Sequence, residues 1–224
     1  HAPDWLDEHR VDDRAILPGA VHAALALAAG LNGLSALSIE APLTIGPDGV
    51  ELQTIVHDNG RVRIHAREVG TSDWKRYASA EPGTAPAALG MENLAALMAR
   101  CDTPIAPETF YQRLATGGIA LGPRFRRLVE IRAGQNEALA RLCVPDDLEP
   151  NGLPVHPLVL DALFQTLGAA LIRTDRPAHL PVALDGLQRA AGASPNAAVW
   201  CHATLRPPTP GGDGLIGDLS LLAA

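Results

Sequence analysis

Three polar residues of this chain have types and spacings suited to acid–base chemistry. His9 lies in the charged run DEHRVDDR, directly before a proline and an apolar segment. Asp161 lies inside a second apolar segment, and Gln165 follows four residues later, on the same face of the predicted helix. A neutral imidazole can take a proton and a carboxylic acid can give one. His9 and Asp161 are therefore candidates for the base and the acid of a β-elimination.

Each of these residues also has a purely structural interpretation. A histidine among charged residues is usually a solvated loop residue, and an aspartate in an apolar helix can mark the position where that helix reaches the surface. A carboxylate buried in such a helix is costly unless it is paired or functional, which favours a functional role for Asp161. His22, within the first apolar segment, is expected to be a packed or rim histidine rather than a second base.

The element that must position His9 begins at Pro18. Proline suits the first turn of a helix and glycine suits the residue after its end, so Pro18, Gly19 and Gly30 frame a helix over residues 20–29. This segment is made almost entirely of Ala, Leu and Val, so the helix must be covered on every side.

Strands that can cover this helix are predicted directly after it. Apolar and polar residues alternate over residues 50–56 and 62–66, on either side of the turn Asp58-Asn59-Gly60. This alternation around a turn indicates a hairpin. A further strand is predicted over residues 74–80.

The same pattern recurs in the second half of the chain. A stretch rich in Pro, Ala and Gly precedes two predicted helices, and Pro157 opens an apolar helix over residues 158–171. The chain is interpreted as two copies of one α+β unit, each a long apolar helix wrapped by a curved antiparallel sheet. The predicted helices before Pro157 cover residues 91–100 and 107–116, and the predicted strands cover residues 124–133, 137–144, 179–187, 198–205 and 215–222. The predicted division is a first half over residues 1–80, a linker over 81–103 and a second half over 104–224.

Composition excludes several classes of function. Of the 224 residues 47% are apolar, enough for one large core or two small fused ones, and the net charge of −7 argues against nucleic-acid binding. The cysteines, Cys101, Cys143 and Cys201, form no CxxC pair, so neither a zinc site nor a disulfide framework is indicated. No apolar run is long enough to span a membrane and no signal peptide is evident, so we expect a cytoplasmic protein without membrane association.

Three ordered stretches carry more specific information: HRVDDRAILPG, LATGGIALGPRFRRL and HPLVLDALFQ. Together they resemble the dehydratase domain of a modular type I polyketide synthase, and the resemblance covers nearly the whole chain. The first is similar to the family's His-x3-Gly-x4-Pro motif, the second to its Tyr-Gly-Pro-x-Phe-Arg motif, and the third to its His-Pro-x3-Asp-x3-Gln motif. The residues that match are His9 and Pro18, then Gly122, Pro123, Phe125 and Arg126, then His156, Pro157, Asp161 and Gln165. The family fold is a double hot dog, in agreement with the duplicated α+β pattern.

The resemblance implies a substrate and a reaction. The substrate would be a 3-hydroxyacyl chain carried as a thioester on the phosphopantetheine arm of an acyl carrier protein, and the products a trans-2-enoyl thioester and water. His9 would remove the C2 proton. Asp161, kept protonated by its apolar helix, would protonate the departing C3 hydroxyl, and Gln165 would hydrogen-bond Asp161 or that hydroxyl.

The resemblance also implies a binding surface and partners. The amino end of the first apolar helix, near Gly19, offers N–H groups and a positive dipole end to the thioester oxygen. The residues expected to bind substrate are Pro18, Gly19, Leu121, Gly122, Pro123 and His156. We expect no metal and no cofactor bound by the domain itself. The expected partners are the acyl carrier protein and other polyketide synthase domains in a bacterial cytoplasm, with a homodimer left open.

Two departures from the motifs keep other functions open. The glycine of the first motif is Asp13 here, and the tyrosine of the second is Leu121. Both support a catalytically silent domain, kept as a structural part of the synthase. The same acid and base also suit double-bond migration or oxa-Michael ring closure, although retention of Asp161 and Gln165 together favours dehydration. A free-standing hot-dog thioesterase is disfavoured, because the three motifs point elsewhere.

Overall fold

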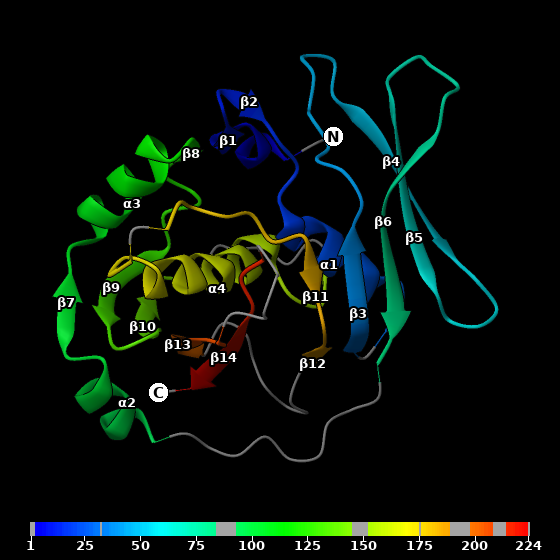
Figure 1. Cartoon of the computed structure of the whole chain (residues 1–224). Helices are drawn as coiled ribbons and strands as arrows, with labels where there is room; N and C mark the ends of the chain where they lie inside the picture. Colours follow the sequence, from blue (N-terminus) through cyan, green and yellow to red (C-terminus); the bar gives the residue numbers. More distant parts are fainter. Residues whose placement is uncertain are drawn as a thin grey trace. The chain divides into compact units, whose positions relative to one another are not determined.

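The chain forms two units, each built from antiparallel strands and a long apolar helix (Figure 1). The computed structural model describes residues 3–31, 33–83, 93–144, 152–174, 176–188, 198–207 and 214–223. The first unit comprises His1–Leu89, Glu149–Pro157 and Leu180–Ala193, and the second comprises Gly90–Leu148, Leu158–His179 and Ser194–Ala224.

The central helix of the first unit is α1, Gly19–Ala28, which begins directly after Pro18 as predicted. Pro18 has φ −61°, the value that its ring imposes, and it forms the amino-terminal cap. Most of the helix is buried, including the polar residue His22, and α1 contacts strands β3 and β5. The expectation that this helix must be covered is therefore confirmed.

The sheet of the first unit is antiparallel and has the strand order β11-β3-β6-β5-β4, with β12 also paired to β3. The predicted hairpin is confirmed as β4 and β5, which pair from Val50↔Glu68 to Val56↔Val62. A 3-10 helix and a short hairpin, β1–β2, precede α1. The bounds are η1 Asp4–Glu8, β1 His9–Val11, β2 Arg14–Ala15, β3 Gly33–Ile39, β4 Val50–Val56, β5 Val62–Glu68, β6 Lys75–Pro82, β11 Ala183–Leu184 and β12 Leu187–Gln188.

The single strand predicted over residues 179–187 is wrong in extent. Two short strands, β11 and β12, form there, and both pair with β3 of the first unit rather than with strands of the second. Pro181 lies in the predicted strand and has no N–H to donate, which limits regular pairing there. Gly33 on β3 allows the approach of β12, because a Cβ at this position would lie 3.0 Å from the Leu187 carbonyl oxygen. Residues 180–193 therefore group with the first unit, although the sequence placed them in the second half.

In its described residues, the second unit has a sheet of order β14-β13-β10-β9-β7 and the helices α2, α3 and α4. Its long helix α4 starts at Pro157, as predicted, and packs against the sheet: a Cβ at Gly217 on β14 would collide with Leu167 of α4. The shorter helix α2 packs through Leu97 against Leu139 and Trp200. The bounds are α2 Leu94–Arg100, β7 Thr103–Ile105, α3 Pro107–Thr116, β8 Ile119–Leu121, β9 Leu128–Ala133, β10 Glu137–Leu142, α4 Pro157–Ala170, β13 Ala198–Leu205 and β14 Gly217–Ala223.

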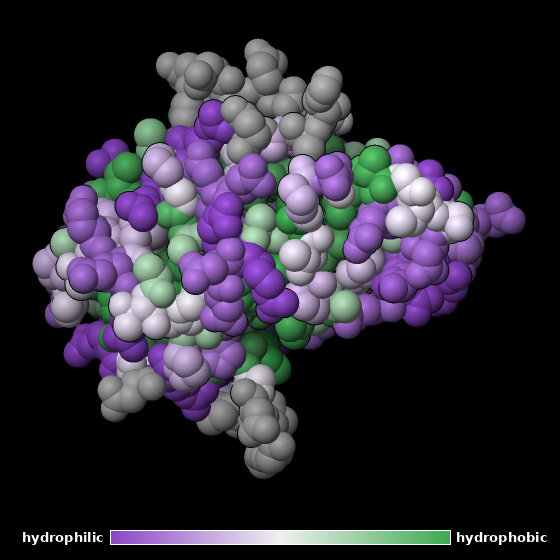
Figure 2. All heavy atoms as spheres, turned by 90° about the horizontal axis from the view of Figure 1, so that it is seen from above, coloured by the Kyte–Doolittle hydropathy of each residue, from purple (hydrophilic) through white to green (hydrophobic). Residues whose placement is uncertain are grey.

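The apolar side chains of both long helices are mainly buried inside the units. On the face shown in Figure 2, hydrophobic residues form small areas among hydrophilic ones. Within the described part of the chain, none of the helices combines the length and the apolar character that crossing a bilayer requires.

The burial of His22 predicts a pH-dependent stability. Burial lowers the pKa of His22 from 6.5 to about 4, against a smaller raising effect of the Pro18 carbonyl. The unfolded chain therefore binds a proton at this site below pH 6.5 that the folded chain does not take up until about pH 4. As the pH falls through this window, His22 should remove about 3 kcal/mol from the free energy of unfolding.

The test is urea unfolding of the parent and of His22→Leu between pH 7.5 and 4.5. The variant should lose less stability on acidification than the parent does. His179→Leu, at an exposed histidine, should follow the parent at every pH. Parallel curves for the parent and His22→Leu would contradict the assignment.

Candidate active site

Asp161 and Gln165 form a buried hydrogen-bonded pair on α4. Their exposed fractions are 6% and 7%, so the interpretation of Asp161 as a surface position is wrong. Gln165 Nε2 donates to Asp161 Oδ2 over 2.7 Å and to the Phe125 carbonyl oxygen over 2.9 Å. The helical spacing of four residues places the two side chains on one face, as predicted.

The oxygen end of the Gln165 amide is bound by a residue that the sequence did not single out. Tyr111 of α3 donates its hydroxyl to Gln165 Oε1 over 3.0 Å, and the Leu128 N–H donates to the Tyr111 oxygen over 3.0 Å. Burial raises the pKa of Tyr111 above its usual range, against a smaller lowering effect of the hydrogen bond from the Leu128 N–H. Tyr111 therefore stays neutral and keeps the proton that it donates.

His9 is buried, with an exposed fraction of 4%, although its sequence neighbours are charged. It starts β1, where it points inward while Arg10 is exposed. Its Nδ1 lies 2.9 Å from the Ile16 carbonyl oxygen. A carbonyl oxygen only accepts, so Nδ1 carries the hydrogen, and in the neutral ring the basic lone pair is on Nε2.

The turn after β1 contains Asp13, the residue that departs from the first motif. Asp12 and Asp13 have φ +48° and +63°, and both side chains are exposed. Positive φ at both central residues is the geometry of a tight two-residue hairpin turn, which Asp and Gly adopt more readily than most residues. Asp13 thus keeps the backbone conformation that a glycine would provide, and it faces solvent. Arg10 bonds the turn through the Asp13 carbonyl oxygen, over 2.8 Å.

The other candidate residues of the first unit lie at helix starts. Pro18 and Gly19 open α1. A Cβ at Gly19 would lie 3.0 Å from both Ile39 Cδ1 and Pro181 Cγ, so close packing favours glycine there. His156 precedes α4, is buried, and packs its ring against Trp5 with 5.7 Å between the ring centroids.

Leu121, Gly122 and Pro123 end β8 and begin a turn. The Phe125 N–H donates to the Gly122 carbonyl oxygen over 3.0 Å. Leu121 is buried, and its carbonyl oxygen accepts a bond of 2.8 Å from Arg126 Nε. The second motif therefore forms one structured loop that delivers the Phe125 carbonyl to Gln165.

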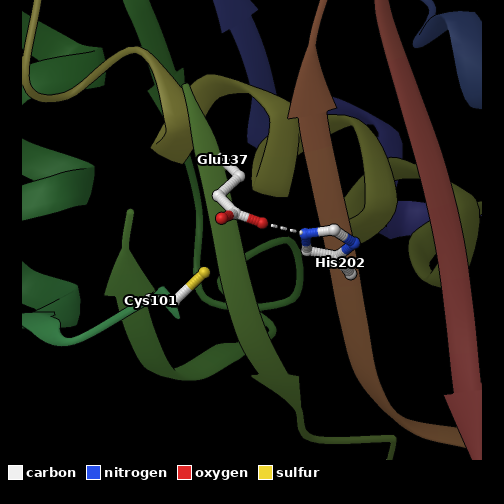
Figure 3. Close-up of side chains that lie close together, drawn as sticks. All are labelled: Cys101, Glu137 and His202. Atoms are coloured by element: carbon white, nitrogen blue, oxygen red, sulfur yellow. Dashed lines mark hydrogen bonds and ion pairs between the residues drawn. The ribbon is translucent and has the colours of Figure 1, made fainter. Parts of the chain in front are cut away.

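A second group of side chains capable of binding a metal, drawn in Figure 3, brings together Cys101 at the end of α2, Glu137 of β10 and His202 of β13. The ligand atoms of Cys101, Glu137 and His202 lie within 4.8 Å of one another, and their types are those that zinc prefers. Glu137, however, already accepts bonds from Arg100 and, over 2.8 Å, from His202 Nε2. Burial and the charge of Glu137 raise the pKa of Cys101 to about 11, so its thiol stays protonated. Glu137 thus accepts hydrogen bonds from Arg100 of α2 and from His202 of β13, and these bonds tie α2 to β10 and β13.

Two family models match this chain. A family model described as "Polyketide synthase dehydratase N-terminal domain" matches residues 90–224, and one described as "Polyketide synthase dehydratase domain" matches residues 1–68. A phenolphthiocerol/phthiocerol polyketide synthase protein of Mycobacterium tuberculosis is 30% identical over 76% of this chain, and polyketide synthase GfsE of Streptomyces halstedii is 32% identical over 85%. The aligned part amounts to 9% and 6% of those two proteins.

Solved structures with the same fold are dehydratase domains. The dehydratase domain of PpsC from Mycobacterium tuberculosis is 27% identical, with a TM-score of 0.78 over 98% of this chain and 82% of that domain. The dehydratase domain of a mycocerosic acid synthase-like polyketide synthase is 25% identical, with a TM-score of 0.81 over 98% of this chain and 81% of that one. These domains are double hot dogs, so the predicted fold class is confirmed.

The interactions of Glu137 with Arg100 and His202 predict a second way in which stability depends on pH. Burial alone would raise the pKa of Glu137, but the hydrogen bonds from Arg100 and His202 outweigh it and hold the pKa below its usual range. The stabilisation is therefore complete above the unfolded pKa of 4.5 and is lost as the pH falls below it.

Glu137→Gln should lower the free energy of unfolding by about 1–3 kcal/mol at pH 7, and this difference from the parent should shrink in acid. Urea unfolding measures this. Glu51→Gln, at a more exposed pair with Arg67, should cost less than about 1 kcal/mol, and an equal cost in the two variants would contradict the assignment.

The turn at Asp13 predicts that backbone conformation decides which residues fit. Asp13→Gly should change the free energy of unfolding by less than about 1 kcal/mol, because glycine adopts φ +63° freely but is more flexible when unfolded. Asp13→Val should lose about 1–2 kcal/mol, because a β-branched residue disfavours positive φ. Chemical denaturation of both variants tests this, and equal tolerance of valine and glycine would disprove it.

Proposed function

Because the chain belongs to the polyketide synthase dehydratase family, we propose that it removes water from a 3-hydroxyacyl thioester and releases a trans-2-enoyl thioester. The substrate would be held on the phosphopantetheine arm of an acyl carrier protein. The observation that carries this proposal is the buried pair of Asp161 and Gln165, with 2.7 Å between Gln165 Nε2 and Asp161 Oδ2. Burial keeps this carboxyl group out of water, and the Gln165 N–H fixes its orientation, so that a positioned acid is available on α4.

His9 is the proposed base. Its Nδ1 hydrogen is used by the Ile16 carbonyl, which fixes the ring orientation and assigns the basic lone pair to Nε2. Nε2 would take the proton from C2 of the substrate. The thioester carbonyl makes that proton acidic, since the charge left on C2 spreads onto the thioester oxygen.

Donors for that oxygen are available at the start of α1. The helix runs for ten residues from Gly19, and its first N–H groups and positive dipole end would stabilise the developing enolate. The close packing around Gly19 also holds the start of the helix in place.

Asp161 is the proposed acid. It would give its proton to the C3 hydroxyl as the C3–O bond breaks, so that water leaves and the C2–C3 double bond forms. The C2 proton ends on His9 and the acid proton ends in water, so the step balances without a redox partner. Proton return to Asp161 and loss from His9 would restore the starting state. The mechanism requires one substrate to reach both side chains.

The substitutions at Asp13 and Leu121 give little support to a silent domain. Asp13 keeps the turn conformation and is exposed, and Leu121 keeps its main-chain bond to Arg126. The proposed partners are the acyl carrier protein and neighbouring synthase domains. The curated relatives described above are bacterial and far longer than this chain, which supports a setting within a larger bacterial cytoplasmic synthase.

Incubation with a short 3-hydroxyacyl thioester on an acyl carrier protein tests the proposal. Mass spectrometry of the carrier should show the loss of one water. Double-bond migration in an enoyl substrate, without water loss from the hydroxy substrate, would indicate an isomerase instead. An unchanged hydroxyacyl carrier would defeat the dehydratase proposal.

Two substitutions test the acid and the base separately. Asp161→Asn removes the acid with little change in shape, and His9→Phe removes the base. Each should lower kcat at least about 100-fold, the lower end of what a positioned acid or base contributes. Asp185→Asn and His179→Phe make the same changes at exposed positions and should retain parental rates. Parental turnover in Asp161→Asn or in His9→Phe would show that the assigned role is wrong.

A further inference from the structure

The hydrogen bonds around Gln165 have a fixed direction, because groups of known polarity stand at both ends. The Leu128 N–H can only donate, so the Tyr111 oxygen accepts and its hydroxyl hydrogen is free to point to Gln165 Oε1. At the other end, the Phe125 carbonyl can only accept, so it requires the NH2 group of Gln165.

A flipped Gln165 amide would break this order at both ends. Its oxygen would then face two acceptors, the Phe125 carbonyl and Asp161 Oδ2. Its NH2 group would face a Tyr111 oxygen that already accepts from Leu128. Gln165 therefore presents an N–H to Oδ2 in the only orientation that pairs donors with acceptors.

The Tyr111 ring is itself held in place. Its centroid lies 5.2 Å from the ring of Phe110, in an edge arrangement, and the Arg126 guanidinium carbon lies 5.6 Å away over its face. Arg126 is anchored in turn by the Leu121 carbonyl. Tyr111 is as buried as Asp161, both being 6% exposed, so its hydroxyl is confined to the interior of the unit.

We propose that Tyr111 is a positioning residue for the acid: through Gln165 it keeps an N–H on Asp161 Oδ2, over 2.7 Å, and so fixes the orientation of the carboxyl group that protonates the departing hydroxyl. This inference rests on the proposed dehydration, and it adds one residue to the proposed machinery.

Removal of the Tyr111 hydroxyl should weaken the hydrogen bond that Asp161 accepts from Gln165, although Asp161 itself is not substituted. In Tyr111→Phe, Gln165 Oε1 loses its donor and the Leu128 N–H loses its acceptor. Both groups lie 3.0 Å from the position of the missing oxygen, so each can move toward the other. Gln165 should shift toward Leu128, and its bond to Asp161 should lengthen.

The experiment is a double-mutant cycle on the 224-residue chain, with Tyr111→Phe, Gln165→Ala and both together. With the short 3-hydroxyacyl carrier-protein thioester, Tyr111→Phe should lower kcat about tenfold, the effect of about one hydrogen bond, and leave KM within about twofold. In the Gln165→Ala background the same substitution should leave kcat unchanged. Tyr77→Phe, at the other tyrosine of the chain, should keep the parental kcat.

The outcomes separate this inference from the function on which it rests. A parent that releases no water defeats the proposed function. If the parent is active and Tyr111→Phe keeps the parental kcat, only the positioning role is defeated, whatever the melting temperature of the variant. The positioning role is also defeated if the fold losses in kcat of the two single variants multiply in the double variant. A crystal structure of Tyr111→Phe tests the positioning role without any measurement of activity. Gln165 still bonded to Asp161 Oδ2 at the parental distance would overturn the inference.

Discussion

A carboxyl group inside an apolar helix has to be matched by donors, and that requirement organises much of the second unit. Asp161 lies on a helix with almost no other polar side chains, so Gln165, one turn later, supplies the donor. Gln165 then needs its own partners, which come from α3 through Tyr111 and from the loop after β8 through Phe125. One buried acid thus connects a helix, a loop and the start of a strand in a single hydrogen-bonded network.

The parts of the fold that follow from local pattern could be predicted. Pro18 and Pro157 mark the starts of the two long helices, alternation marks the β4–β5 hairpin, and the spacing of Asp161 and Gln165 places them on one face. Pairing between distant segments could not be predicted in this way, because β3 carries no information about β11 or β12. Tyr111 was missed for the same reason: the partners of a phenol hydroxyl depend on the tertiary contacts, and its sequence neighbours show only an amphipathic helix.

The burial of His9 is a case in which motif and local composition disagreed. A charged run predicts a solvated loop, but a two-residue turn at Asp12-Asp13 folds the run into a hairpin whose inward position is His9. The charged neighbours remain exposed on the other face. Alternation along a short strand therefore separates a buried imidazole from the charges that surround it in sequence.

The pairing of β11 and β12 with β3 has a consequence for the order of folding during synthesis. A chain made from its amino end completes β3, β4, β5 and β6 early, but the free edge of β3 is closed only when residues 183–188 emerge. Until then the backbone groups on that edge are unpaired, and an unpaired edge is open to association with other strands. The first unit can thus reach its full strand order only after α4 of the second unit has been made.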